Sequence, residues 1–175
     1  QNKKVVLIGT DIRNPDLSKL FDKKKPNHKG LTNIINDDKN DFKELFKKYK
    51  ITYNQLDTLF VGTESTKRIN IFDSEKFDNL ISYLKKKYDY VIFDTAPILF
   101  MVDSLELLEK SDYVIHVFRK NFSPKRVVNY VLDYKEKYKP KNIGYVITDD
   151  SKPDKFIDKY GYGYGYGYGY GYGVS

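Results

Sequence analysis

Short runs of apolar residues recur along the chain, and segments with a helical spacing of apolar positions separate them. The runs cover residues 5–8, 58–61, 90–93, 113–118 and 143–147. They are rich in Val, Ile, Tyr and Phe, and they are nearly continuous instead of alternating with polar residues. Continuous runs of this length are typical of parallel strands that are covered on both faces. The pattern therefore predicts five buried strands in a mainly parallel sheet.

Two of the intervening segments have the spacing of amphipathic helices. In residues 74–87, Ser74 has the chemistry of an N-cap, and four apolar residues fall on one helix face. These residues are Phe77, Leu80, Ile81 and Leu84. A second helix is expected to open at Ser123, with Pro124 as its first helical residue. Its predicted apolar stripe consists of Val127, Val128, Val131 and Leu132.

The alternation of strands and helices predicts an α/β fold in which three layers surround a mainly parallel sheet. Ligands of such sheets bind at the carboxyl ends of the strands, so we expect the chemistry just after Ile8, Phe93 and Phe118. The character of the chain changes at Asp149, and residues 160–173 alternate Tyr and Gly without exception. Such a segment cannot form a packed core. We therefore expect a folded domain at residues 1–150 and a linker with a flexible Tyr/Gly-rich tail at residues 151–175.

Composition narrows the functional classes. A chain of 175 residues is long enough for one domain with a core, and the absence of cysteine excludes disulfides and thiolate metal sites. No run approaches the roughly 18 apolar residues of a membrane span, so a cytosolic setting fits the sequence best. The formal net charge of +7 is compatible with nucleic acid, an anionic membrane, a nucleotide or simply a lysine-rich proteome. The lysines form scattered clusters that fit a solvated surface, and nucleic acid is not an expected partner.

Two aspartates follow predicted strands in positions that suit a metal nucleotide. Asp11 follows the first strand, and Asp94 directly follows the apolar run 90–93 in the manner of a Walker B carboxylate. Magnesium is usually bound by one or two carboxylates together with substrate phosphates. Either aspartate alone also fits an ordinary turn at the end of a strand.

The motifs in combination resemble those of the bacterial tyrosine kinases (BY-kinases). VVLIGTDIRNP is similar to their second Walker motif, an apolar run followed by Asp-x-Asp-x-Arg and a nearby proline. YDYVIFDTAPILFMVDS is similar to their Walker B block, with a later aspartate at Asp103. The tyrosine-rich C-terminus is a third hallmark of the family. This resemblance covers nearly all of the chain and implies a P-loop-type fold related to the MinD and ParA ATPases.

The resemblance also implies roles for individual residues. Asp11 and Asp94 are expected to coordinate Mg²⁺, directly or through water, and Arg13 is expected to support the phosphate side of an ATP site. Expected nucleotide contacts are Thr10, Asp11, Thr95 and Arg119, although Arg119 equally fits a simple charge at a strand end. The expected phosphoacceptors are Tyr160, Tyr162, Tyr164, Tyr166, Tyr168, Tyr170 and Tyr172.

The expected function is that of an ATP-dependent autokinase that controls capsular or extracellular polysaccharide synthesis and export. The resemblance implies a homo-oligomeric ring in which each tail enters a neighbour's active site. It also implies a transmembrane polysaccharide co-polymerase as activator, a tyrosine phosphatase as opponent, and a place at the cytoplasmic face of the bacterial inner membrane. Two alternatives stay open. One is a non-catalytic substrate and oligomerisation module, and the other is a MinD/ParA-like ATPase, which has no need of a polytyrosine tail.

The sequence departs from the family pattern in several places. The 175 residues contain no GxxxxGK[ST] loop, which supplies backbone N–H groups and a lysine to the phosphates and a hydroxyl to Mg²⁺. The simplest interpretation is a truncated or separately supplied C-terminal piece, and a degenerate homologue is the alternative. Gly9 replaces the first aspartate of Asp-x-Asp, which is a candidate for activating the tyrosine hydroxyl. Asp11 is therefore expected both to bind Mg²⁺ and to activate this hydroxyl. Ala96 replaces a proline, and Thr148 with Asp149 stands where relatives often have an adenine-reading asparagine.

The remaining candidates have ordinary structural interpretations. His116 lies inside a predicted strand and is expected to be a packed or edge histidine instead of a metal ligand. His28 lies in a Pro-Asn-His-Lys loop and is expected to be exposed to solvent. The Tyr-Gly tail also fits a low-complexity segment that associates through aromatic contacts, or a linker.

Overall fold

The computed structural model describes residues 2–12, 14–21, 28–38, 41–63, 71–96, 103–120, 123–139 and 142–148. The chain forms two compact units, of which the first comprises residues 1–112 and the second begins at Tyr113. The predicted boundary between residues 150 and 151 and the whole tail lie outside the described residues. In the part that is described, no helix has the length and apolarity needed to cross a bilayer.

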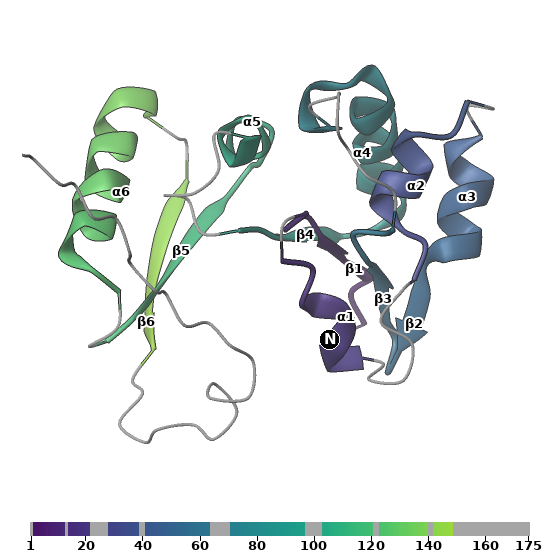
Figure 1. Cartoon of the computed structure of the whole chain (residues 1–175), viewed down its shortest axis with the longest axis horizontal. Helices are drawn as coiled ribbons and strands as arrows, with labels where there is room; N and C mark the ends of the chain where they lie inside the picture. The colour runs from purple at the N-terminus through teal and green to yellow at the C-terminus, as the bar shows by residue number, and fades with distance from the viewer. Residues whose placement is uncertain are drawn as a thin grey trace, which may run out of the picture. The chain divides into compact units, whose positions relative to one another are not determined.

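The first unit contains a four-stranded sheet in the order β2-β3-β1-β4 (Figure 1). Strands β1 (Val5–Gly9), β3 (Leu56–Leu59) and β4 (Tyr90–Asp94) are parallel, whereas β2 (Ile51–Tyr53) pairs with β3 in antiparallel fashion. The α/β fold with a mainly parallel sheet is therefore confirmed. The sequence pattern missed β2, because this strand has only three residues and two of them are exposed.

The run predicted as a strand at 58–61 is displaced by two residues from β3. Phe60 and Val61 are buried like strand residues, but their carbonyl groups leave the sheet. They accept hydrogen bonds from Leu31 N at 2.9 Å and Thr32 N at 2.7 Å, respectively. An apolar run thus continues past the end of the strand because the chain is buried against another segment.

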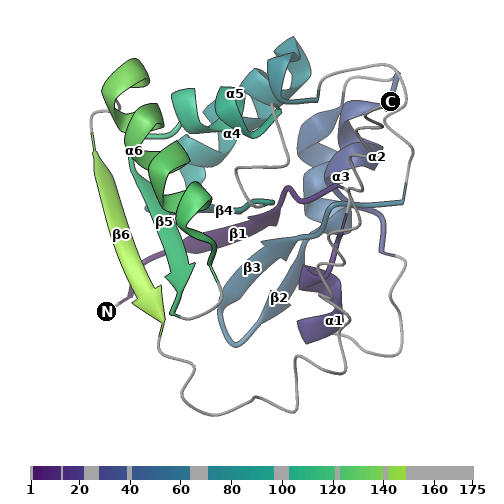
Figure 2. The same cartoon turned by 60° about the vertical axis from the view of Figure 1, so that its left-hand side comes forward.

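The helices of the first unit are α1 (Leu17–Phe21), α2 (Leu31–Ile35), α3 (Phe42–Tyr49), α4 (Glu75–Lys87) and α5 (Asp103–Glu109), with a 3₁₀ turn η1 (Ile71–Asp73). Figure 2 shows α2, α3 and α4 grouped over the sheet. Helix α4 confirms its prediction, since Ser74 Oγ accepts a hydrogen bond from Phe77 N at 3.2 Å and the four predicted apolar residues are buried. They join the core residues of β1 and β3 and Phe46 of α3.

The second unit pairs β5 (Val114–Arg119) with β6 (Ile143–Thr148) in parallel, and α6 (Lys125–Tyr138) connects them. Pro124 was predicted as the first helical residue, but it is the extended N-cap residue, whose carbonyl accepts a hydrogen bond from Val127 N. The predicted stripe is also partly wrong. Val131 is buried, while Val128 and Leu132 stay 37% and 48% exposed. Tyr134 takes a place in the packed face instead, because its ring contacts His116 of β5.

Candidate functional site

Strands β1 and β4 lie side by side and end at the same edge of the sheet. Gly9, the last residue of β1, is paired with Asp94, the last residue of β4. Thr10 continues this pairing, because both its backbone N and its Oγ1 donate to the Asp94 carbonyl oxygen, at 2.9 and 2.8 Å. The parallel pairing therefore brings Asp11 and Asp94 to adjacent strand ends. The buried Thr10 holds these two strand ends together through its hydrogen bonds.

Asp11 lies in the turn that follows β1. Its Oδ1 accepts a hydrogen bond from Asn14 N at 2.9 Å, the contact by which an aspartate commonly closes a turn. Asp11 thus closes an ordinary turn at the end of a strand, which is one of the two interpretations of the sequence. This hydrogen bond does not prevent metal binding, because a carboxylate has a second oxygen with its own acceptor sites. Arg13, in the same turn, lies outside the described residues.

The charges at this edge are not balanced by protein cations in the described part of the chain. Partial burial raises the pKa of the Asp94 carboxyl, and the negative charge of Asp11 raises it further. The side chain of Asp94 remains accessible to solvent on one side. Among the described residues no Lys, Arg or His forms a salt bridge with either aspartate.

Two neighbouring carboxylates without a counter-charge suit a divalent cation. No group of three or more His, Cys, Asp or Glu residues that could hold a metal occurs within the described ranges. A cation at Asp11 and Asp94 would therefore need further oxygen ligands from water or from a phosphate. That requirement fits Mg²⁺, which binds through one or two carboxylates plus substrate phosphates and waters.

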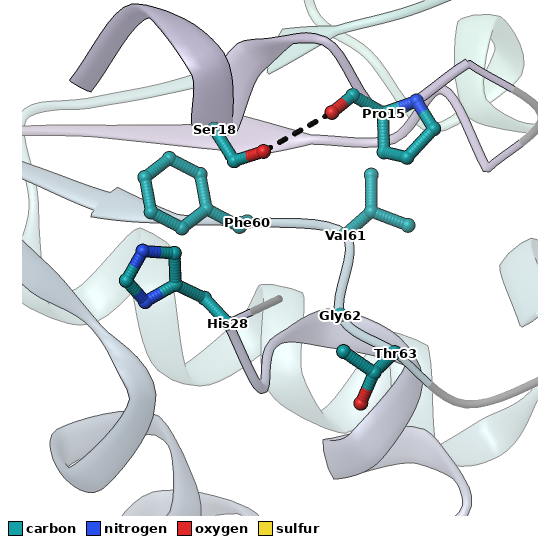
Figure 3. Close-up of a pocket in the computed structure, with 7 residues that line it drawn as sticks. All are labelled: Pro15, Ser18, His28, Phe60, Val61, Gly62 and Thr63. Atoms are coloured by element: carbon teal, nitrogen blue, oxygen red, sulfur yellow. Dashed lines mark hydrogen bonds between the residues drawn. The ribbon is translucent and has the colours of Figure 1, made fainter. Parts of the chain in front are cut away.

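A cavity of about 240 Å³ lies beyond the carboxyl ends of β1 and β3 (Figure 3). In the strand order, β3 lies on the other side of β1 from β4 and Asp94. The residues that line the cavity are Pro15, Ser18, His28, Phe60, Val61, Gly62 and Thr63. Ser18 Oγ donates to the Pro15 carbonyl oxygen at 3.2 Å, which fixes one wall. His28 was expected to be exposed, but it is half-buried because its ring packs against Phe60 with centroids 5.1 Å apart.

The opposite wall of this cavity is held by close backbone packing at two glycines. A Cβ atom on Gly30 would lie 2.0 Å from the Phe60 carbonyl oxygen, and Gly62 has a φ of +103°. The side chain of Asn33 connects the two segments, because its Oδ1 accepts from Gly30 N at 2.9 Å and from Thr63 N at 3.2 Å. No motif of the sequence predicts a role for either glycine, but only glycine permits this close approach of the two segments.

Gly9, which stands in place of the first aspartate of Asp-x-Asp, is also confined. A Cβ atom there would lie 3.2 Å from Leu17 Cδ2 and 3.4 Å from Val61 Cγ2. A larger side chain at this position would thus require Leu17 to shift. Thr95 and Ala96 follow Asp94 at the edge of the sheet, and Ala96 is buried.

The other predicted site residues are not brought to this edge by anything that the structure describes. Arg119 ends β5 in the second unit, where its backbone N donates to Ser123 Oγ at 2.9 Å. Its nucleotide contact stays a prediction. Thr148 Oγ1 donates to the Phe118 carbonyl oxygen at 3.3 Å, while Asp149 and all seven tail tyrosines lie outside the described residues.

His116 is packed among aromatic rings, as predicted. Its ring stacks on Tyr145 at 6.1 Å and meets Tyr134 edge-on at 6.2 Å. Burial lowers the pKa of His116, which favours the neutral imidazole. The surroundings are those of a packed side chain and not of a metal ligand.

Comparison with known proteins assigns the chain to a family. The AAA domain family model matches residues 1–141. Tyrosine-protein kinase CpsD of Streptococcus pneumoniae is 31% identical over 161 residues, which are 90% of this chain and 66% of that protein. The putative tyrosine-protein kinase CapB of Staphylococcus aureus is 29% identical over 101 residues, 58% of this chain and 42% of the relative. The chain thus spans at most 66% of the length of these curated relatives.

A solved structure supports the same relationship. The crystal structure of the VpsO kinase domain superposes with a TM-score of 0.73 and 26% sequence identity. The match covers 85% of this chain and 71% of that one.

Proposed function

This chain belongs to the AAA domain family, as a domain of the bacterial tyrosine-kinase type, and from that premise we propose that it takes part in ATP-dependent phosphorylation of its own tail tyrosines. The observation that carries the proposal is the pair of carboxylates, Asp11 and Asp94, at the adjacent carboxyl ends of β1 and β4. A parallel α/β sheet binds its ligands at this edge.

The chemistry asked of these residues is mainly positioning and control of charge. Asp11 and Asp94 would hold Mg²⁺, which when bound supplies the positive charge that phosphoryl transfer requires. A phenol has a pKa of about 10, but phosphoryl transfer depends mainly on positioning and charge stabilisation, so a strong base is not essential and Asp11 is proposed as the acceptor of the tyrosine proton. Thr10 keeps the two strand ends together through its bonds to the Asp94 carbonyl. Arg13 is proposed to face the phosphates.

The proposed acceptors are the seven tyrosines of residues 160–173. In the proposed assembly, the tail of one subunit enters the site of its neighbour in a ring. A transmembrane polysaccharide co-polymerase activates the kinase at the cytoplasmic face of the inner membrane, and a tyrosine phosphatase reverses the reaction. The regulated process is capsular or extracellular polysaccharide synthesis.

The phosphate-binding loop must come from elsewhere in this proposal. The 175 residues contain no GxxxxGK[ST] segment, so we expect them by themselves to bind ATP weakly and not to autophosphorylate. The same feature favours a second candidate, a non-catalytic substrate and oligomerisation module. Reading the coding sequence upstream of Gln1 for a phosphate-binding loop is the first step in separating the two.

The deciding experiment is incubation with labelled Mg-ATP. The 175-residue chain alone is expected to stay unlabelled. A form that also carries a phosphate-binding loop is expected to label its tail, and a variant with all seven tail tyrosines changed to Phe is expected to lose that label. Rapid labelling of the chain alone would show that our account of the loop is wrong. Absence of labelling in both forms would favour the non-catalytic module, and ATP hydrolysis without tyrosine labelling would favour a MinD/ParA-like ATPase.

Phosphorylation is proposed to act as an electrostatic switch. Each phosphotyrosine adds about −1.5 to −2 charges, so four of them approximately cancel the formal +7. Successive acceptors lie within about 7 Å of each other along an extended chain, inside the roughly 8 Å screening length. A phosphorylated tail would therefore be expelled from the acidic edge at Asp11 and Asp94. Equal sedimentation of phosphorylated and unphosphorylated assemblies would contradict the switch.

A further inference from the structure

A group of exposed lysines surrounds helix α3. We call it the α3 basic face, and its members are Lys29, Lys43, Lys47, Lys48 and Lys87. The acidic residues on the same helix and its N-cap are only Asp41 and Glu44. Within the described residues, Lys47 is the single member that forms a salt bridge, to Glu44 at 2.5 Å. Within α3 and its N-cap, three of these lysines stand beside the two acidic residues, and Lys29 and Lys87 add two positive charges from outside the helix.

The lysines are arranged around aromatic rings. Lys87 Nζ lies 5.5 Å from the ring of Phe46, 5.8 Å from that of Tyr83 and 5.6 Å from that of Tyr88. The pKa of Lys47 is raised, first by its hydrogen bond to Glu44 and then by the Glu44 charge, with smaller contributions from Tyr83 and Asp41. Lys87 and the rings of Phe46, Tyr83 and Tyr88 thus form one cluster between the C-terminal parts of α3 and α4.

A second cluster surrounds Tyr49, the last residue of α3. Lys48 Nζ and Lys29 Nζ each lie 6.0 Å from the ring of Tyr49, which is only partly buried. Lys29 comes from the segment before α2, so two separate parts of the chain place an ammonium group at this ring. Ammonium groups next to aromatic rings form sites that are both cationic and apolar.

We propose that the α3 basic face binds the phosphorylated Tyr-Gly segment, residues 160–173, of the same chain or of a second copy. The proposal rests on the proposed function, which supplies the phosphotyrosines. A phosphotyrosine presents a dianion on an aromatic ring, so it matches both the exposed lysines and the partly exposed rings of Tyr49 and Tyr83. The segment repeats this group every second residue, about 7 Å apart when extended, and several weak contacts along α3 then add up.

The aromatic rings beside the lysines favour this occupant over an anionic membrane. A layer of lipid headgroups would use the lysines, but it makes no specific use of the rings beside them. The same argument explains the fate of the modified tail. Phosphorylation makes the tail repel the aspartates at the ends of β1 and β4, and it creates attraction to the α3 basic face on the helical layer. The tail would move from the first surface to the second.

The test uses the full 175-residue chain and a synthetic peptide of residues 160–173, either unphosphorylated or with four phosphotyrosines. Binding of the phosphopeptide is measured by fluorescence anisotropy. Lys47→Glu with Lys87→Glu is expected to weaken binding about tenfold or more. The matched control, Lys135→Glu with Lys137→Glu, makes the same charge change in the last turn of α6 and is expected to weaken binding by no more than about twofold.

Further variants keep the test independent of folding. Lys47→Arg with Lys87→Arg preserves both charges and is expected to retain binding. If the first glutamate pair proves unfolded by circular dichroism, Lys43→Glu with Lys48→Glu reverses two exposed charges of the same face and is expected to weaken binding. Sedimentation of a chain ligated to the phosphorylated tail separates the two sources, because docking within one chain leaves a monomer and docking on a second copy does not.

Several results would overturn the proposal. Equal binding of the unphosphorylated peptide would remove the role of phosphate, and equal loss in the α6 control would reduce the effect to net charge. Binding of anionic phospholipid vesicles that needs Lys47 and Lys87, without phosphopeptide binding, would identify the face as a membrane surface. Because the phosphopeptide is synthetic, its failure to bind is distinct from failure of the kinase assay, which tests the proposed function.

Discussion

Two aspartates of the same sheet, Asp57 and Asp94, have opposite surroundings. Asp57 lies on β3, where it faces Val6 near the start of β1, and Asp94 lies at the carboxyl end of β4. Burial acts to raise the pKa of Asp57, but hydrogen bonds from Lys50, Thr52 and Tyr88 together lower it. The pKa of Asp94 is raised by burial and by the charge of Asp11.

The contacts of Asp57 account for its stability as an anion. Lys50 Nζ donates to Oδ1 at 2.7 Å, Thr52 Oγ1 donates to the same oxygen at 2.5 Å, and Tyr88 OH donates to Oδ2. Burial and the bond to Asp57 in turn raise the pKa of Tyr88, so the phenol stays protonated. This network connects the β2–β3 hairpin to the end of α4. It is a structural site that is complete without a ligand.

The carboxyl-terminal edge is built on a different principle. Its segments are held by backbone hydrogen bonds and by glycine packing at Gly30 and Gly62, while its two carboxylates are left without a described protein cation. A like-charged pair costs free energy unless another group balances it. The difference supports the proposal that the edge at Asp94 binds a ligand, whereas the surroundings of Asp57 serve the fold.

The largest effect is expected from disturbing the backbone packing at the edge. Gly30→Ala would put a Cβ atom 2.0 Å from the Phe60 carbonyl oxygen, so we expect a loss of more than about 3 kcal/mol in the free energy of unfolding. Urea unfolding measures it. The control is Gly144→Ala, where the nearest atom to the new Cβ is 4.0 Å away and the change should stay within about 0.5 kcal/mol. Similar stability of both variants would refute the role of close packing.

The next effect concerns function and separates the two aspartates directly. In a form of the protein that carries a phosphate-binding loop, Asp94→Asn is expected to reduce tail phosphorylation on the order of 100-fold, because the metal site loses a charge. Asp57→Asn is expected to leave phosphorylation within about twofold when the protein is folded. The measurement is the initial rate of label transfer from Mg-ATP. Equal rates for the two variants would remove the contrast between the sites.

A smaller effect concerns stability at the Asp57 network. Asp57→Asn is expected to lower the free energy of unfolding by about 1–2 kcal/mol at pH 7, because charge-assisted hydrogen bonds are lost. Tyr88→Phe removes one of these bonds and is expected to cost about 1 kcal/mol. The folded state lowers the pKa of Asp57, so its contribution is present above the ordinary value of 3.8 and is lost as the pH falls through the folded pKa. The difference from Asp57→Asn should therefore shrink in acid, and a constant difference would contradict this account.

The smallest expected effect concerns Asp94, where stability changes with pH in the opposite direction from Asp57. Because the folded state raises the pKa of Asp94, the folded protein holds this proton more tightly, and stability falls as the pH rises from 3.8 through the folded value. Asp94→Asn removes that fall and should stabilise the chain at neutral pH by no more than about 1 kcal/mol. Thermal unfolding between pH 3 and pH 8 checks the sign. Destabilisation by Asp94→Asn at pH 7 would show that a cation already balances the charge of the site.

Local patterns in the sequence were sufficient for much of the fold. Helix α4 follows from its apolar spacing and from Ser74, because a helix cap and a helix face depend on residues within a few positions of each other. The parallel strands follow from continuous apolar runs, but the prediction of five buried strands in one sheet is wrong, because β5 and β6 pair in a sheet of their own and β4, β5 and β6 expose part of their apolar residues. The candidate site also follows from local motifs, since Asp11 and Asp94 are each recognisable at the end of a strand, and parallel pairing brings such ends together.

The features that only the tertiary structure decided all depend on contacts between distant segments. Whether Phe60 and Val61 extend a strand or bind α2 is settled by the amide groups of Leu31 and Thr32, some 30 positions away. His28 is half-buried because its ring packs against Phe60. The pKa of Asp57 is lowered because Lys50, Thr52 and Tyr88 donate hydrogen bonds to its carboxylate. Aspartates look alike in a sequence, and their pKa values are determined by which groups the fold places around them.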